Sequence, residues 1–381
     1  MKKRVIALIL AAALTGLCGC SAFFKKEYLS VSEYTEGTKS DFDGDLADIE
    51  DYEGLTKAIN AMLTAHKQEG RVVFKNYQGD LQSDLAQACW EVKTKSALGS
   101  YAVDYVSHDL NRIVTYYEAT IYITYNRSQE ELEKIHYVSG RASLVEELSK
   151  ELESLSRYNV YRISSATITA DEILSILERA YTSNPLSCVV EPKASVRLHP
   201  ESGAHRIVEI DIDYGKTLSQ LRGMKQELAE AINSISTDFG RYDSTEYARQ
   251  AYNALASFCV YDPEGVQRAE NGLAPELSSS PYGALVERYA DSRGIALAYA
   301  ALCQKVGIES IVINGSLEKQ NHSWNIIKID DSYYHVDVSA DSFWGAGNSF
   351  MKSDYQMQGR YWWNIESYPE SSDDTQGAAF S

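Results

Sequence analysis

The sequence has few cysteines and is short of cations. Its 381 residues include six cysteines, and 54 acidic side chains outnumber 36 basic ones, so the formal net charge is −18. Cys89, Cys188, Cys259 and Cys303 stand singly in apolar segments, which leaves one disulfide possible but implies no disulfide framework and no metal site. The acidity argues against nucleic acid, an anionic bilayer or a polyanionic wall polymer as a general partner. We expect no nucleic-acid partner and no cofactor.

The N-terminal 20 residues have the pattern of an export signal. Residues 2–4 are basic, and the apolar run at 5–14 is too short to remain as a membrane span. The ending Leu-Cys-Gly-Cys at 17–20 resembles a bacterial lipoprotein signal, which implies cleavage before Cys20 and diacylation of its thiol. Cleavage would take the net charge to −21 and leave the protein lipid-anchored at the cell membrane on its extracytoplasmic face. A plain cleaved signal is the alternative.

Residues 21–50 are polar and acidic without a sustained period, which predicts a tether. The DFDGD run at 41–45 invites a calcium-binding reading, but its glycine does not fall where an EF-hand loop requires one. Residues 371–381 are also polar and poor in aromatics, and we expect a disordered tail there.

The region 51–237 contains an internal repeat. ATIYITYNR at 119–127 aligns with VEIDIDYGK at 208–216, at an offset of 89 residues without a gap. Each copy, 51–157 and 158–237, reads strand, helix, strand, strand: 72–75, 81–93, 101–107 and 115–125, then 158–163, 170–181, 188–196 and 205–214. Further helices are expected at 55–66, at 130–156 with a break, and at 218–234. The pattern predicts a duplicated α+β region, two small sheets covered by helices, that acts as a spacer or binding module.

The C-terminal third opens with a helix at 245–258 and continues to a segment at 291–308 with helical spacing. Its apolar residues recur from Ile295 to Val306, and Gly307 ends the pattern. Ser292 lies at the start of this helix, where backbone N–H groups point outward and the helix dipole favours negative charge. A nucleophile would be placed there, although the residue type alone equally suits an N-cap.

Residues 321–329 and 333–339 predict a hairpin. If Asp330 and Asp331 form a two-residue turn, Asp337 faces Trp324, and His322 lies two residues further along the same face. Such diagonal neighbours are about 7–8 Å apart at Cβ. A hydrogen bond between the imidazole of His322 and the carboxylate of Asp337 is therefore within reach.

These segments resemble the transglutaminase-like family, whose motifs read C-x-G-Y-A, H-A-W-N and Y-H-V-D-V. The corresponding motifs here are SRGIA at 292–296, HSWN at 322–325 and YHVDV at 334–338. The resemblance covers residues 240–370, and it implies a papain-like α+β fold with Ser292, His322 and Asp337 at the catalytic positions. Trp324 and Asn325 lie near that site, where Trp324 either shields the His–Asp pair or packs in the core. The aromatic run at 361–363 either lines a peptide groove or packs ordinarily.

One departure from the family motif bears on activity. Ser292 stands where the family has its nucleophilic cysteine, and a hydroxyl does not ionise as a thiol does at such a position. Ser292 would need His322 as a general base. Cys303 lies 11 residues further along the helix, about 16 Å away, and Cys259 is more simply a core residue.

Three functions follow. The favoured one is a catalytically impaired pseudoenzyme that binds a peptide or protein side chain at the cell surface. The second is a peptidase or acyl transferase that uses Ser292, His322 and Asp337 as nucleophile, base and orienting residue. The third is a structural surface protein.

Overall fold

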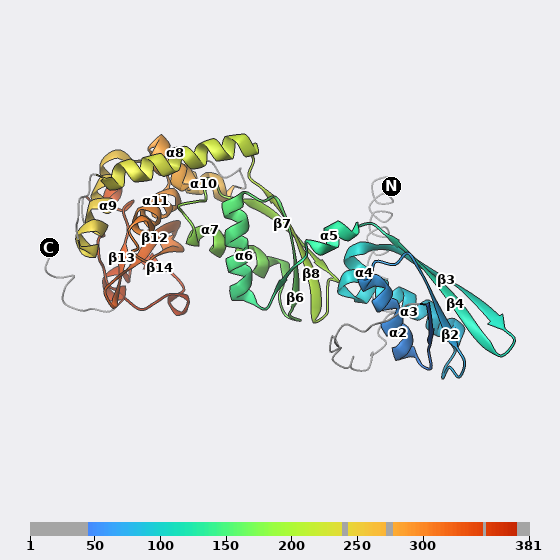
Figure 1. Ribbon diagram of the computed structural model, residues 1–381. Coiled ribbons are helices and arrows are strands. Elements are labelled where there is room, and N and C mark those ends of the chain that lie inside the picture. The colour runs from blue at the N-terminus through green and yellow to red at the C-terminus, as the bar shows by residue number, and fades with distance from the viewer. Residues whose placement is uncertain (1–44, 238–242, 272–276, 346–347, 372–381) are drawn as a thin grey trace, which may run out of the picture. The chain divides into compact units, whose positions relative to one another are not determined.

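The computed structural model describes residues 45–237, 243–271, 277–345 and 348–371, which belong to a single unit (Figure 1). The expected signal with Cys20, all but the last residues of the expected tether and nearly all of the expected tail lie outside these described residues. Within the described ranges, the helices are too short or too polar to cross a membrane.

The first sheet has four strands in the order β1-β2-β4-β3. Its strands are β1 (Asp45–Asp48), β2 (Glu69–Phe74), β3 (Val103–Ile113) and β4 (Tyr116–Tyr125), and β1 alone runs parallel to its neighbour. The helices are α2 (Tyr52–Thr64), α3 (Leu81–Lys95) and the short α4 (Ala97–Ala102). Leu55 of α2 and Leu85 of α3 are buried with Val72 and Ile121 of the sheet in one apolar cluster. This burial of alternate strand residues against helix faces is what holds the layer together.

The second sheet has the same strand order, β5-β6-β8-β7. Its strands are β5 (His136–Val138), β6 (Tyr158–Ser164), β7 (Lys193–His199) and β8 (His205–Asp213), with helices α5 (Gln129–Glu133), α6 (Arg141–Ser154) and α7 (Ala170–Ser183). The pairing register is related as well. Arg71 pairs with Thr120 in the first sheet, and Val160 pairs with Glu209 in the second, each 89 residues later.

Three predicted boundaries were wrong, and one prediction was confirmed. Strand β1 falls inside the expected tether, whereas the break expected in the helix at 130–156 is present and contains strand β5. Both are edge strands of three or four residues, too short to show an alternating pattern. Tyr101 lies in the last turn of α4 rather than at the start of a strand, and Cys188 precedes β7 by five residues. Both side chains are buried, as inward-facing strand residues would be.

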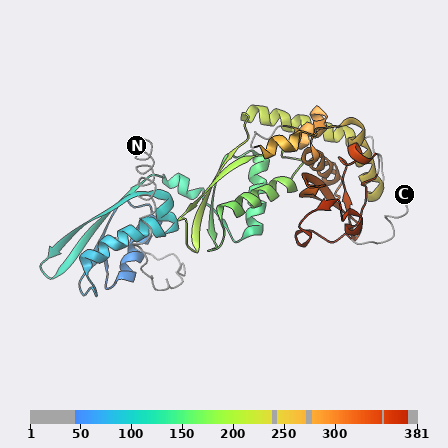
Figure 2. The same cartoon turned by 180° about the vertical axis from the view of Figure 1, so that it is seen from behind.

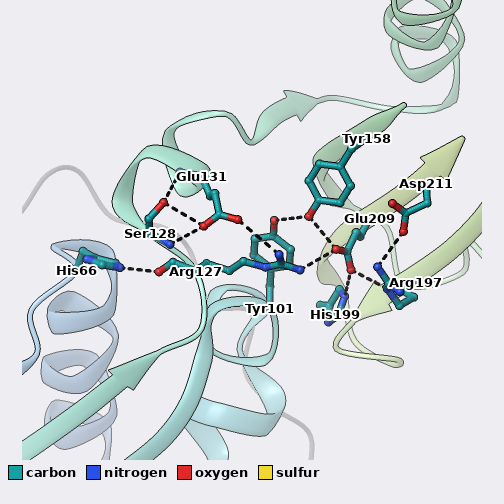
Figure 3. Close-up of polar contacts among 10 residues, drawn as sticks. All are labelled: His66, Tyr101, Arg127, Ser128, Glu131, Tyr158, Arg197, His199, Glu209 and Asp211. Carbon is teal, nitrogen blue, oxygen red and sulfur yellow. Dashed lines mark hydrogen bonds and ion pairs between the residues drawn. The ribbon is translucent and has the colours of Figure 1, made fainter. Parts of the chain in front are cut away.

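A buried carboxylate joins the two sheets (Figure 3). Glu209 on β8 is 2% exposed and accepts hydrogen bonds from Arg127 Nη2 at 2.8 Å and Tyr158 OH at 2.7 Å. Its other oxygen accepts from Arg197 Nε at 2.8 Å and lies 3.1 Å from His199 Nε2. Burial raises the pKa of Glu209, but the bonds from Arg197, Tyr158 and His199 outweigh it and lower that pKa to about 2. Because Arg127 follows β4, this cluster ties the first sheet region to the second.

The C-terminal part consists of helices packed on a four-stranded antiparallel sheet, seen from behind in Figure 2. The sheet has the order β13-β12-β11-β14. Its strands are β11 (Ser310–Leu317), β12 (Gln320–Ile329), β13 (Ser332–Val336) and β14 (Tyr361–Trp362), and the larger helices are α8 (Leu218–Thr237), α9 (Ser244–Phe258) and α11 (Ser292–Lys305). The remaining elements are β9 (Val260–Tyr261), α10 (Gly265–Glu270), η1 (Leu277–Ser279), η2 (Gly283–Glu287), β10 (Tyr289–Ala290), α12 (Asp341–Trp344), α13 (Asp354–Met357) and η3 (Ile365–Ser367).

The second sheet region and the C-terminal part share one apolar core. Val189 and Val190, in the loop after α7, are buried in the same cluster as Leu297 of α11 and Ile327 of β12. The first sheet region has its own core, and Tyr101 and Val160 belong to a small cluster at its junction with the second. The second sheet region therefore shares its apolar core with α11, the helix that carries Ser292.

We predict that Glu209→Ala lowers the free energy of unfolding by about 2–3 kcal/mol, because it leaves two arginines without their buried partner. The matched control is Asp211→Asn, since Asp211 pairs with Arg197 at 2.9 Å but is 46% exposed; it should cost less than about 1 kcal/mol. Urea denaturation at pH 7 measures both.

The same carboxylate predicts a pH dependence. Since the pKa of Glu209 is depressed on folding, its contribution is present above its ordinary value of 4.5 and is lost as the pH falls toward 2. The stability gap between wild type and Glu209→Ala should close over that range. An equal gap at pH 7 and pH 3 would contradict this account.

Candidate active site

Asp291, not Ser292, caps helix α11. Asp291 Oδ1 accepts the N–H of Gly294 at 2.9 Å, and its other oxygen accepts the hydroxyl of Ser279. Burial raises the pKa of Asp291, partly offset by these two bonds. Ser292 is therefore the first helical residue, and the alternative that it acts as N-cap is wrong.

The first turn of α11 packs tightly against η1. A Cβ added to Gly294 would lie 2.1 Å from the carbonyl oxygen of Ser278, so only glycine permits this approach. From Gly294 to Cys303, every residue of α11 is buried. The position of Ser292 is therefore fixed by backbone packing on one side and by the N-cap on the other.

Ser292 is 1% exposed, and its hydroxyl accepts the backbone N–H of Ser323 at 3.2 Å. Among the described residues, it makes no hydrogen bond to His322. The hydroxyl is thus hydrogen-bonded to the residue after His322 and not to the imidazole itself.

The hairpin has the predicted register. Ile329 pairs with Ser332 and Asn325 with Val336, and Asp330 takes a positive φ of 53° in the two-residue turn. This register brings His322 Nε2 to 2.7 Å from Asp337 Oδ2.

Asp337 accepts three further hydrogen bonds beside the contact with His322. Its Oδ1 accepts from Ser339 Oγ at 2.6 Å and from Ala340 N–H at 3.1 Å, and its Oδ2 accepts from Tyr361 OH at 2.8 Å. Burial raises the pKa of Asp337, but the nearby His322 and the hydrogen bonds from His322, Ser339 and Tyr361 outweigh it and lower that pKa. Asp337 is therefore a carboxylate, able to hold the imidazole in one orientation.

Trp324 and Asn325 point to opposite faces of β12. Trp324 is 1% exposed, stacks near His322 with ring centroids 6.3 Å apart, and donates from Nε1 to His335 Nδ1 at 2.9 Å. It is a core residue that also covers the imidazole, so the two alternatives are compatible. Asn325 Nδ2 donates to the carbonyl of Ala296 at 2.9 Å, and its contact ties β12 to α11.

A cavity of about 700 Å³ opens beside Ser292 and His322. Trp362 and Trp363 line it, and Trp362 is 68% exposed, whereas Tyr361 turns inward to Asp337. The groove alternative therefore fits the two tryptophans, and the packing alternative fits the tyrosine. The complete lining is Glu191, Ser279, Asp291, Ser292, Arg293, Asn314, Gly315, Ser316, Asn321, His322, Ser323, Trp362, Trp363 and Asn364.

Sequence reasoning missed the part of the wall that comes from the second sheet region. Arg293 Nη2 lies 2.7 and 2.9 Å from the two carboxylate oxygens of Glu178 and 3.3 Å from Glu191 Oε1. Glu178 and Glu191 precede Arg293 by 115 and 102 residues, and no motif links such distant positions. The charge pattern of α7 alone does not predict that Glu178 contacts Arg293.

Neither alternative cysteine substitutes for Ser292. Cys303 is fully buried in α11, and burial raises the pKa of its thiol to about 12. Burial likewise raises the pKa of Cys259 to about 12. Cys89, Cys188, Cys259 and Cys303 are all free thiols, and the described residues contain no group of three or more His, Cys, Asp or Glu side chains that could hold a metal ion.

We predict that Tyr361→Phe lowers the free energy of unfolding by about 1.5–3 kcal/mol, the usual worth of a hydrogen bond to a charged group. The control is Tyr355→Phe, since Tyr355 is 74% exposed in the same segment; its effect should stay within about 0.5 kcal/mol. Thermal denaturation followed by circular dichroism compares them. A silent Tyr361→Phe would mean that this hydroxyl does not support Asp337.

Comparison with known proteins supports the predicted family. Residues 229–338 match the model of the transglutaminase-like superfamily, a range that includes Ser292, His322 and Asp337 and differs in both bounds from the expected 240–370. No curated protein sequence matches the chain.

Two solved structures are similar at low identity. A crystal structure of a TGase is 14% identical over 59% of this chain and 56% of that chain, with a TM-score of 0.30. A protein of Parabacteroides distasonis, provisionally described as a protease, is 11% identical over 61% and 56%, with a TM-score of 0.23. The chain thus spans little more than half the length of these solved relatives. The family match identifies residues 229–338 of this chain as a transglutaminase-like domain.

Proposed function

We propose that this protein is an extracytoplasmic lipoprotein whose transglutaminase-like domain binds a peptide or protein side chain without turning it over. The observation that carries the proposal is the state of Ser292. Its hydroxyl accepts a hydrogen bond from the N–H of Ser323 and makes none to His322 within the described residues. A hydroxyl without its base is a weak nucleophile.

The chemistry of the site explains why the substitution matters. A thiol at position 292 would ionise beside the N-terminus of α11 and an imidazole, and would need no concerted proton transfer. A serine must pass its proton to His322 as it attacks. His322 Nε2 is already occupied by Asp337 at 2.7 Å and by Ser339 at 3.3 Å, so only Nδ1 remains to accept a proton, and among the described residues no hydrogen bond joins it to Ser292.

The site retains a means of binding. The 700 Å³ cavity falls in the range of ligand pockets, and its exposed Trp362 offers an apolar platform among polar side chains. Binding without cleavage therefore needs no group that the site lacks.

The remainder of the chain fits presentation at a membrane surface. The signal at 1–20 and a lipid on Cys20 would anchor it, and the tether would hold the folded part away from the bilayer. The expected copies 51–157 and 158–237 are proposed to be a duplicated α+β unit, supported by the identical strand order of the two sheets and by pairings that repeat after 89 residues; β5 and α6 pack with the second sheet, which moves the start of the second copy ahead of residue 136. The domain at 240–370 would then be presented on the extracytoplasmic side of the membrane.

A second candidate is an active peptidase or acyl transferase that uses Ser292, His322 and Asp337. The observation that favours it is the intact pair of His322 and Asp337, with the carboxylate held by Ser339, Ala340 and Tyr361. A small approach of Ser292 to His322 Nδ1 on ligand binding would complete the triad. Labelling of Ser292 by a serine-directed probe, dependent on His322, would support this candidate.

The test uses the chain from Ser21 onward in four forms: wild type, His322→Ala, Ser292→Cys, and Ser292→Cys with His322→Ala. We expect no peptide hydrolysis and no amine transfer onto glutamine from the wild type. Ser292→Cys should gain at least about 100-fold over that background, since an activated thiol replaces an unassisted hydroxyl. The double variant should lose the gain.

The outcomes separate the candidates. Wild-type turnover that disappears in His322→Ala would overturn the pseudoenzyme proposal and establish the hydrolase or transferase. Activity confined to Ser292→Cys would support a binding site on an otherwise competent scaffold. Thermal denaturation of each variant shows whether the fold is retained.

A further inference from the structure

One wall of the cavity comes from outside the transglutaminase-like domain. Glu191 lies in the loop between α7 and β7, which belongs to the second sheet region, yet it lines the same cavity as Ser292 and His322. The loop is held in place by its neighbours Val189 and Val190, which are buried in the core shared with α11. Glu191 is therefore positioned rigidly at the site by a part of the fold that sequence comparison leaves unmatched.

Two carboxylates contact Arg293, and one of them, Glu191, also interacts electrostatically with Lys193. Glu178 contacts Arg293 Nη2 through both oxygens, at 2.7 and 2.9 Å, and does not line the cavity. Glu191 reaches the same nitrogen only at 3.3 Å, through Oε1. Two carboxylates thus share one guanidinium, and Glu178 has the closer contact.

The second oxygen of Glu191 has no partner. Among the described residues, no hydrogen bond reaches its Oε2, and the side chain is 28% exposed in the cavity wall. Asp291, the other lining carboxylate, is different: it is 1% exposed, and its two oxygens are taken by Gly294 N–H and the Ser279 hydroxyl. Glu191 is therefore the lining carboxylate that remains able to bind a ligand.

We propose that Glu191 is a specificity-determining residue, which selects ligands that place a cationic side chain, lysine or arginine, in the cavity. The inference rests on the proposed function, since it names the class of peptide that the site would hold. An excess carboxylate in a partly buried wall is stabilised by a cation and repels an anion.

An aromatic residue of the cavity lining suits the same ligand. Trp362 lines the cavity and exposes 68% of its surface. An indole ring packs against the aliphatic stem of lysine or arginine and attracts the charged end through a cation–π interaction. The cavity thus combines a carboxylate with an aromatic face.

The experiment compares two pools of acetylated pentapeptide amides of random sequence, with lysine fixed at the centre of one and norleucine at the centre of the other. Norleucine keeps the stem and removes the ammonium group. Each pool is passed over the immobilised full-length chain in nonionic detergent, and retained peptides are counted by mass spectrometry. We expect the wild type to retain the lysine pool about fivefold better, as a partly exposed ion pair provides.

The decisive variants are Glu191→Gln and Glu172→Gln. Glu172 lies on α7 and pairs with Arg141 away from the cavity, so both variants change the net charge equally. Glu191→Gln should bring the lysine-to-norleucine ratio close to one, whereas Glu172→Gln and the charge-conserving Glu191→Asp should keep a preference for lysine. This comparison separates the contribution of Glu191 to lysine binding from the general attraction of an acidic protein for cations.

Two failures are distinguishable. If both pools are retained equally by wild type, or if the preference survives Glu191→Gln, the role of Glu191 is overturned while peptide binding stands. If wild type retains neither pool, the proposed peptide-binding function fails, and this inference fails with it. The unfolding temperature of Glu191→Gln is measured as a control for folding. Because the substitution removes a partly buried charge, we expect this temperature to be at or above that of the wild type.

Discussion

The candidate site depends on the capping of helix α11 by Asp291. One oxygen of Asp291 holds the N–H of Gly294, and the other holds the hydroxyl of Ser279. Capping by Asp291 orients the next three residues. Ser292 faces the N–H of Ser323, Arg293 faces Glu178, and Gly294 packs on the backbone of η1. Because α11 is almost wholly buried, an error at its cap would be transmitted to both the cavity and the shared core.

The two junctions of the folded part are built from different interactions. The first sheet region meets the second through the polar cluster around Glu209, with a small apolar patch containing Tyr101 and Val160 (Figure 3). The second meets the C-terminal part through a continuous apolar core and the ion pairs of Arg293. Burial of apolar surface is the larger stabilising term, so the second sheet region and the transglutaminase-like domain should unfold together.

Local patterns in the sequence predicted most of the site, but they did not predict the contacts between residues far apart in the chain. The period of two and the Asp330-Asp331 turn determine the hairpin register, so the approach of His322 to Asp337 followed by counting. Residue type alone does not identify the cap of α11, because Asp and Ser are both good N-cap residues, and the hydrogen bond from Gly294 N–H to Asp291 decides it. The contact of Glu191 with Arg293 spans 102 residues and depends on how two regions pack. Nothing periodic encodes such a contact.

The pair formed by His322 and Asp337 has a structural role that does not depend on turnover. Asp337 is 1% exposed and accepts bonds from His322, Ser339, Ala340 and Tyr361. Removing either partner of such a buried pair leaves an uncompensated charge or unsatisfied donors, at a cost of several kcal/mol. Position 292 has no comparable constraint, since its hydroxyl makes one hydrogen bond among the described residues, to a backbone N–H. The fold therefore constrains His322 and Asp337 more tightly than it constrains the side-chain type at position 292.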